Sequence, residues 1–182
     1  LDMIQNYQYK RTVSLNKPIK FGFVRGPVWN FGDEDMKHGI EEFVKNAQLD
    51  IEELDLGKDF DDAAKAHEII MNGSIANSLI NYYQTDKSNL HPFTVKRIEA
   101  GIPVSASDYV SAIEQAKKME QILKQFFKKY DAIITPAAPG QAPRDLMNTG
   151  NAIFNGYWTM MGVPSISLPF LKGKDDLPIG IQ

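Results

Sequence analysis

The residues best suited to chemistry stand close together near position 155. Asn151, Asn155 and Thr159 recur every four residues, so on a helix they share one face. Their amide and hydroxyl groups are uncharged donors and acceptors that could orient a carboxamide. The adjacent face carries Phe154 and Trp158. Spacing alone favours a core role for this apolar stripe over a place in a pocket.

Two neighbouring segments must position that helix. A short strand over residues 131–135 runs into the proline-rich turn Pro136 to Gly140. Spacing alone favours a rigid surface turn, because proline presets the backbone angle. The other interpretation is that the turn borders a site, since ligands of open α/β sheets bind beyond the carboxyl ends of the strands. Gly162 is predicted to stop the helix, and Gly156 to let a neighbouring backbone approach closely.

The first third of the chain predicts a βαβ unit. Apolar residues alternate between Ile19 and Phe23, which indicates a strand. Acidic residues 33–35 then open an amphipathic helix, where carboxylates suit the positive end of the helix dipole. Residues 51–56 supply the next strand. Two strands joined by a helical crossover are expected to run parallel.

Three further helices are expected between this unit and the turn. The first spans 61–83 with an interruption at Gly73, and the second runs from His91 to Gly101. Ser107 is the predicted N-cap of the third, which extends to Tyr130.

Two strands are expected near the end of the chain. Ser165 and Ser167 are predicted to flank Ile166 within a strand, and residues 177–182 to form the other. That last strand is expected to expose unpaired backbone and apolar surface.

Composition narrows the range of functions. The chain has 182 residues, 43% of them hydrophobic, which suits one globular domain or a large part of one. Its net charge of −3 gives no footprint for nucleic acid or an anionic membrane. It has no cysteine and no apolar run long enough to cross a bilayer. No signal peptide is recognisable, so we predict a cytoplasmic protein.

Several motifs in fixed order resemble the carboxyl-terminal half of the amidase signature family. They are residues 90–94 (LHPFT), 97–101 (RIEAG), 105–109 (SASDY), 130–140 (YDAIITPAAPG), 149–159 (TGNAIFNGYWT) and 162–169 (GVPSISLP). The resemblance implies an α/β fold with a mixed β-sheet covered by helices, here truncated at both ends. Residues 17–182 would be the C-terminal portion of the domain, and residues 1–16 a linker or helix end from a missing upstream part.

The resemblance implies that the turn from Pro136 to Gly140 borders the amidase cleft, and it also implies a chemistry. Enzymes of this family cleave carboxamide C–N bonds through an acyl-enzyme, with a serine, cis-serine and lysine triad and no cofactor. The nucleophile belongs to a glycine- and serine-rich stretch that has no counterpart here, and no lysine here matches the family's base. No residue is therefore assigned a catalytic role, and none is assigned a metal. The complete protein is expected to be an amidase, and this chain alone to be inactive.

Asn151, Phe154, Asn155 and Trp158 are the predicted substrate-binding residues. The expected partners are a small-molecule amide, the missing N-terminal half of the protein and a second copy in a homo-oligomer, but neither nucleic acid nor a membrane. Two alternatives stay open. One is the glutaminase-type A subunit of a tRNA-dependent amidotransferase, and the other is a non-catalytic, amidase-like binding module.

Overall fold

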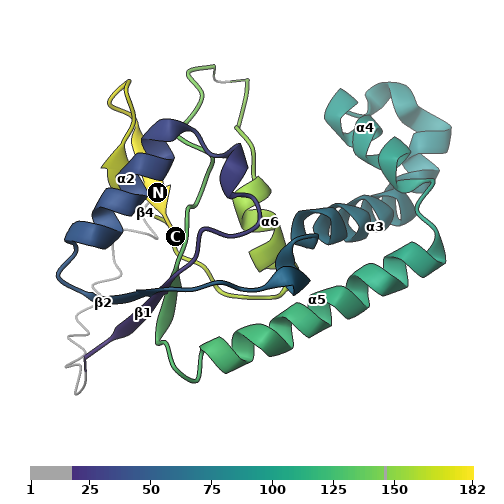
Figure 1. Cartoon of the computed structure of the whole chain (residues 1–182). Coiled ribbons are helices and arrows are strands. Elements are labelled where there is room, and N and C mark those ends of the chain that lie inside the picture. Colours follow the sequence, from purple (N-terminus) through teal and green to yellow (C-terminus); the bar gives the residue numbers. More distant parts are fainter. Residues whose placement is uncertain (1–17, 146) are drawn as a thin grey trace, which may run out of the picture.

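The computed structural model describes residues 18–145 and 147–182, and it is built from a sheet body and a helical arm (Figure 1). The linker predicted for residues 1–16 lies outside the described residues. The helices are α2 (Glu34–Asn46), α3 (Ala63–Asp86), α4 (Pro92–Gly101), α5 (Ala106–Phe126) and α6 (Ile153–Met160). The strands are β1 (Lys20–Phe23), β2 (Asp50–Glu53), β3 (Ala132–Ile134), β4 (Leu168–Lys172) and β5 (Pro178–Ile181).

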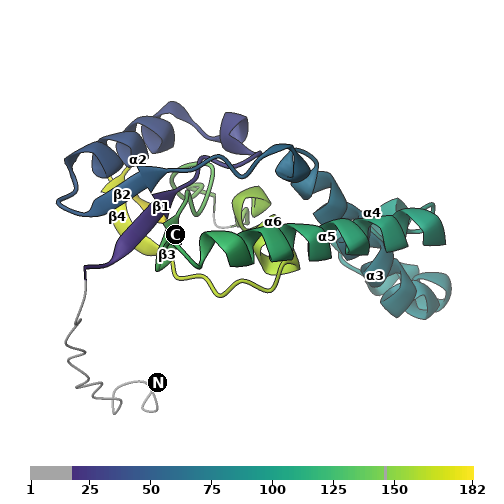
Figure 2. The ribbon, with the colours of Figure 1, turned by 60° about the horizontal axis from the view of Figure 1, so that its bottom comes forward.

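A parallel three-stranded sheet organises the body. Its strand order is β2-β1-β3, with Phe21 opposite Ile51 on one side and Ala132 on the other. The predicted βαβ unit is therefore confirmed. In Figure 2, α2 lies on one side of β1 and β2, whereas α5 and α6 lie on the other.

The last two strands make the fold mixed, as expected. β4 and β5 pair antiparallel, and β5 continues against the chain that follows β3 through an antiparallel bridge between Pro136 and Ile181. The strand predicted to expose apolar surface is instead paired, and its Ile179 and Ile181 are buried. Ser165 and Ser167 precede β4 rather than lying within it, so that prediction was wrong.

Side-chain caps mark the start of three helices. The Asp33 carboxylate accepts from the Met36 N–H at 2.8 Å and caps α2, and His91 Nδ1 accepts from the Phe93 N–H at the start of α4. The cap of α5 is Ser105, not the predicted Ser107, because the Ser105 hydroxyl accepts from the Asp108 N–H at 3.0 Å. Both serines suit a cap, and only the backbone path decides between them.

Two glycines set how closely the arm helices pack. A Cβ on Gly101 would lie 2.0 Å from the backbone oxygen of Asn72, so α4 meets the backbone of α3 directly. A Cβ on Gly73 would lie 3.0 Å from the Tyr109 ring. The predicted interruption at Gly73 does not occur, since α3 passes through it unbroken. Gly73 instead leaves space for the ring of Tyr109 on α5.

This difference gives a matched pair of substitutions. Gly101→Ala is expected to lower the free energy of unfolding by about 2 to 3 kcal/mol, because backbone cannot yield to the new methyl group. Gly73→Ala is expected to be near neutral, since a gain in helix propensity of up to ~1 kcal/mol offsets a small shift of Tyr109. Urea unfolding followed by circular dichroism measures both, and equal effects would contradict the packing argument.

Candidate functional site

Three other segments of the chain contact the proline-rich turn that follows β3 and fix its position. Pro136 bridges to Ile181 of β5, and the Asp33 N–H at the start of α2 donates to the Pro139 carbonyl at 2.8 Å. The Asn155 side-chain amide of α6 donates to the Ala137 carbonyl at 2.9 Å. The turn thus fixes α6 at the carboxyl edge of the sheet, where the sequence predicted a site.

Local hydrogen bonds define both ends of α6. The Asn151 side-chain oxygen accepts from the Ile153 N–H at 3.0 Å just before the first turn. At the other end Gly162 has a φ of 68°, and the Val163 N–H reaches back to the Trp158 carbonyl at 3.2 Å. This is the αL ending that glycine favours, so the predicted stop at Gly162 is confirmed.

The predicted substrate residues divide into two groups. Asn151 is exposed and Asn155 is half-buried, both towards the N-terminal end of α6. Phe154 and Trp158 are buried in the main core, together with Tyr157. The aromatic stripe therefore serves the core, as spacing alone favoured, and Trp158 additionally lines a cavity of about 670 Å³. Asn151, Phe154 and Asn155 line neither that cavity nor the second one described below.

Three buried polar atoms lie close together where α6 packs against the end of β3, and the sequence did not predict that they would meet. They are the hydroxyls of Thr135 and Tyr157 and the indole N–H of Trp158, and none makes a well-formed hydrogen bond. Burial raises the pKa of Tyr157 to about 12, an effect that the neighbouring Thr135 and Trp158 partly offset. The Tyr157 hydroxyl also lies 2.6 Å from where a Cβ on Gly26 would stand, and Gly26 has a φ of 77°. A glycine is thus required at that position.

A second cavity, of about 380 Å³, opens between α3, α5 and α6. His67 of α3 and Thr159 of α6 are among its lining residues. The His67 ring packs against Gly156, where a Cβ would lie 2.6 Å from Nδ1. Gly156 therefore accommodates a side chain rather than the neighbouring backbone that the sequence suggested. The glycine itself was the only sequence signal for this contact.

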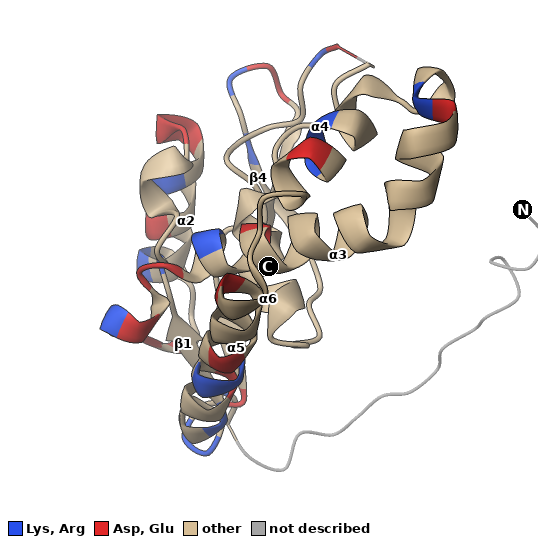
Figure 3. Cartoon of the chain, turned by 90° about the vertical axis from the view of Figure 1, so that its right-hand side faces the viewer, with Lys and Arg blue, Asp and Glu red and all other residues tan. Residues whose placement is uncertain are grey.

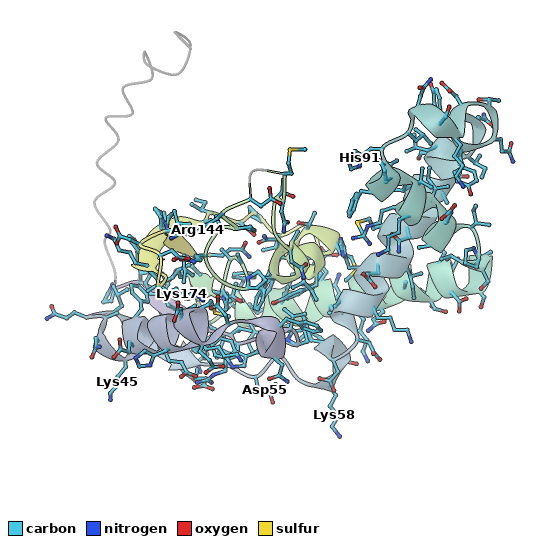
Figure 4. The ribbon with its side chains drawn as sticks, turned by 90° about the horizontal axis from the view of Figure 1, so that it is seen from above. Lys45, Asp55, Lys58, His91, Arg144 and Lys174 are labelled. Carbon is cyan, nitrogen blue, oxygen red and sulfur yellow. The ribbon has the colours of Figure 1, made fainter. Side chains whose placement is uncertain are left out.

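The three histidines have separate settings. His91 caps α4 and, in Figure 4, lies on the arm, apart from the body that carries Arg144 and Lys174. His38 is exposed on α2. His67 is half-buried, and loss of hydration lowers its pKa from 6.5, with Arg97 adding to the effect and Glu68 opposing it.

The lowered pKa of His67 predicts a dependence of stability on pH. Below pH 6.5 the imidazole of His67 binds a proton in the unfolded chain but stays neutral in the folded chain. The contribution of His67 to the free energy of unfolding is therefore fully present above pH 6.5 and is lost as the pH falls below it. The loss is at most about 1.4 kcal/mol for each unit between the two pKa values, because solvent screens a half-buried ring. We expect His67→Gln to remove this dependence and His38→Gln to leave it, as measured by urea unfolding at several pH values. A dependence that survives in His67→Gln would assign it to other groups.

Charged side chains near the sheet edge form ion pairs and ring contacts with other residues of the chain. Arg25 follows β1 and binds Glu41 at 3.0 Å and also Glu53, while its guanidinium lies over Phe23 and Trp29. Figure 3 shows basic and acidic residues mixed along α5, where Glu120 and Lys124 pair at 2.6 Å. Within the described ranges no three of His, Asp and Glu gather as a metal site. None of the described helices is long and apolar enough to span a membrane.

Comparison with known proteins places this architecture in a family. The family model described as Amidase matches residues 3–182, so the chain belongs to the amidase family. It is 27% identical to the A subunit of the Agathobacter rectalis glutamyl-tRNA(Gln) amidotransferase over an alignment 231 positions long, gaps included, which covers 100% of this chain and 46% of that protein. It is 33% identical to fatty acid amide hydrolase of Medicago truncatula over 43% of this chain and 15% of that protein.

Solved structures agree on the fold. A crystal structure of an amidase superimposes with a TM-score of 0.77 at 16% identity, covering 91% of this chain and 42% of that one. The A subunit of the Thermotoga maritima glutamyl-tRNA(Gln) amidotransferase gives 0.59 at 21% identity, covering 90% and 37%. The chain therefore spans less than half the length of these relatives.

Proposed function

We propose that the chain is the C-terminal part of a cytoplasmic amidase signature hydrolase that cleaves carboxamide C–N bonds. In the complete protein, a serine outside these residues attacks the amide carbonyl, the C–N bond breaks, and ammonia or an amine leaves. Water then hydrolyses the acyl-enzyme ester. This chain supplies one wall of the cleft and no catalytic group. The observation that carries the proposal is the family match over residues 3–182.

The hydrogen bonds of the two asparagines support a specific role for each. A backbone N–H can only donate, so the Asn151 oxygen must face Ile153, which leaves the Asn151 NH₂ free to donate. A backbone carbonyl can only accept, so the Asn155 NH₂ must face Ala137, which leaves its oxygen free to accept. We infer that Asn151 donates to the substrate carbonyl or a neighbouring acceptor, and Asn155 accepts from an N–H.

The aromatic residues would act on the apolar part of the substrate. Trp158 lines the larger cavity, whereas Phe154 is completely buried beside it in the core. We propose that Trp158 contacts the substrate and that Phe154 holds α6 in register beneath it.

The test is hydrolysis by the complete protein. Released ammonia or amine is measured with a panel of aliphatic and aromatic carboxamides, and the acyl-enzyme is trapped and located by mass spectrometry. Turnover through a serine ester upstream of this chain supports the proposal. A full-length protein without any such serine would instead favour a non-catalytic binding module.

A second candidate is favoured by the identity of the relatives. The A subunits of glutamyl-tRNA(Gln) amidotransferases from Agathobacter rectalis and Aliarcobacter butzleri are 27% and 32% identical to the matched parts of this chain. The complete protein would then release ammonia from glutamine for a partner protein. Glutamine hydrolysis that appears only when the partner proteins are present would distinguish this role from a stand-alone amidase.

A further inference from the structure

One carboxylate joins the turn between β4 and β5 to the segment that follows the proline-rich turn. Oδ1 of Asp175 accepts from the Arg144 guanidinium at 2.7 Å, and Oδ2 accepts from the Gln141 side-chain amide. The Asp175 N–H donates back to the side-chain oxygen of Gln141 at 3.2 Å. Asp175 therefore holds both ends of residues 141–144. We call these three residues, Gln141, Arg144 and Asp175, the clamp.

The turn between β4 and β5 is itself fixed, so it can serve as an anchor. Within the turn, the Asp176 N–H donates to the Gly173 carbonyl at 3.0 Å. The Lys174 N–H donates to the Asp35 carboxylate in the first turn of α2, also at 3.0 Å. In Figure 4, Lys174 and Arg144 lie on the same side of the body. The clamp thus ties residues 141–144 to a turn that α2 supports.

The close approach of Gln141 requires a glycine at position 173. A Cβ on Gly173 would lie 2.4 Å from the side-chain oxygen of Gln141. That oxygen is at the far end of a flexible side chain, so an alanine at this position would displace Gln141 rather than backbone. Gly173 is not among the glycines of positive φ, so alanine would not strain its backbone. Gly173→Ala can therefore release Gln141 without altering any charge.

Pro143 connects the clamp to the predicted substrate residue Asn151. It lies between Gln141 and Arg144 in the sequence, and its Cδ is 3.5 Å from where a Cβ on Gly150 would stand. Gly150 immediately precedes Asn151 and has a φ of 82°. The clamped segment therefore packs beside the residue from which the chain turns into Asn151.

The clamp adds little to global stability. The Arg144 side chain is 73% exposed and that of Asp175 is 28% exposed, and ion pairs so open to water contribute little to the free energy of unfolding. The Arg144 guanidinium and the Gln141 amide hold the pKa of the Asp175 carboxyl below its usual range. The carboxyl is thus ionised, and both of its oxygens can accept. The effect of these bonds is local, on the position of residues 141–144.

We propose that Asp175 is a positioning residue that determines where Asn151 meets the substrate. It acts through Gln141 and Arg144, whose segment packs beside Gly150, and it needs no contact with the substrate itself. The inference rests on the proposed function, because it takes Asn151 to donate to an amide substrate.

Trypsin cleavage after Arg144 tests the clamp in the complete protein without any measurement of activity. Cleavage requires the segment to open locally, so its rate reports how often the segment is released. In Asp175→Asn the side chain has one oxygen and must turn its NH₂ towards the donor of either Gln141 or Arg144. We expect cleavage between Arg144 and Asp145, measured by mass spectrometry, to be faster by about fivefold or more. Gly173→Ala is expected to act in the same direction.

Asp176→Asn is the matched control. Asp176 is the next residue of the same turn, and it pairs with Lys172 at 2.7 Å, the distance that also separates Asp175 from Arg144. Its φ of 61° is one that asparagine tolerates. The variant therefore removes one charge and one ion pair from the turn without changing the clamp. Cleavage after Arg144 should stay within about twofold of the rate in the unsubstituted protein.

A double-mutant cycle connects the clamp to Asn151. With a carboxamide substrate, Asp175→Asn is expected to lower kcat/KM of the complete protein by about 5- to 10-fold, and Asp176→Asn to leave it unchanged. In the Asn151→Asp background, Asp175→Asn should change kcat/KM by less than about twofold, because the donor that it positions is already gone. A merely structural role for Asp175 would give losses that add.

Two results overturn the inference. One is cleavage after Arg144 at the same rate in Asp175→Asn and Asp176→Asn, and the other is a loss of kcat/KM that adds fully to that of Asn151→Asp. The proposed function fails separately. Faster cleavage in Asp175→Asn of a protein that hydrolyses no amide supports the clamp and overturns the proposed function. Amide hydrolysis that Asn151→Asp lowers and Asp175→Asn leaves intact overturns only the positioning role.

Discussion

We expect residues 1–182 produced alone to release no ammonia from any carboxamide above background, and the complete protein to turn over. The expected difference in kcat is at least about 10⁴-fold, because binding and polar stabilisation without a nucleophile retain little of the rate. In the described ranges the hydrogen-bonded serine hydroxyls are those of Ser74 and Ser105, whose partners are Tyr109 and Asp108. No described serine is hydrogen-bonded to a lysine or histidine that could activate it.

The measurement is a coupled ammonia assay with the purified chain at high concentration, and the complete protein serves as the positive control. Activity that copurifies with the chain through two different columns, and that a Ser165→Ala/Ser167→Ala double variant abolishes, would contradict the prediction. It would also require a nucleophile that the sequence motifs do not contain.

Asn151→Asp is expected to lower kcat/KM of the complete enzyme by about 10- to 100-fold while leaving it as stable as before. The aspartate still accepts from the Ile153 N–H, and its charge suits the N-terminal end of α6. It can no longer donate to a substrate carbonyl, however.

Asn155→Asp is expected to lower the free energy of unfolding, because a carboxylate facing the Ala137 carbonyl costs about 1 to 3 kcal/mol.

The chain offers a matched control for this pair. Asn148 accepts from the Gly150 N–H at 2.9 Å in the same way that Asn151 accepts from Ile153, and it is equally exposed. Asn148→Asp therefore introduces the same charge three residues away without touching the proposed site. Steady-state kinetics and thermal melting of the three variants separate the roles. If Asn148→Asp and Asn151→Asp reduced kcat/KM equally, the loss would be electrostatic rather than a lost donor.

Local signals predicted much of the fold. Asp33, His91 and Gly162 each mark a helix end through an interaction within a few residues, and all three predictions are confirmed. The predictions were wrong where residues that are distant in the sequence determine the local structure. α3 continues through Gly73, and the ring of Tyr109 on α5 packs beside this glycine. The last strand is covered because β4 and the chain after β3 both pair with it.

The candidate site was predictable only in outline. Helical spacing grouped Asn151 with Asn155 and separated them from Phe154 and Trp158. It could not reveal which asparagine atoms remain free, because Ala137 and the turn of α6 determine that. His67 and Thr135 were missed as neighbours of α6 because they come from elements remote in the sequence.

The pairing of β1 with β3 has a consequence for biosynthesis. Lys20 and Asp131, which exchange hydrogen bonds across this pair, are 111 residues apart in the chain. At a translation rate of about 5 to 20 residues per second, roughly 6 to 20 s pass between the synthesis of β1 and the synthesis of β3. The arm between them depends on contacts much nearer in sequence and can form first. During that interval Phe23 and Val24 lack the neighbours that bury them, so the nascent chain is expected to engage a chaperone at this stage.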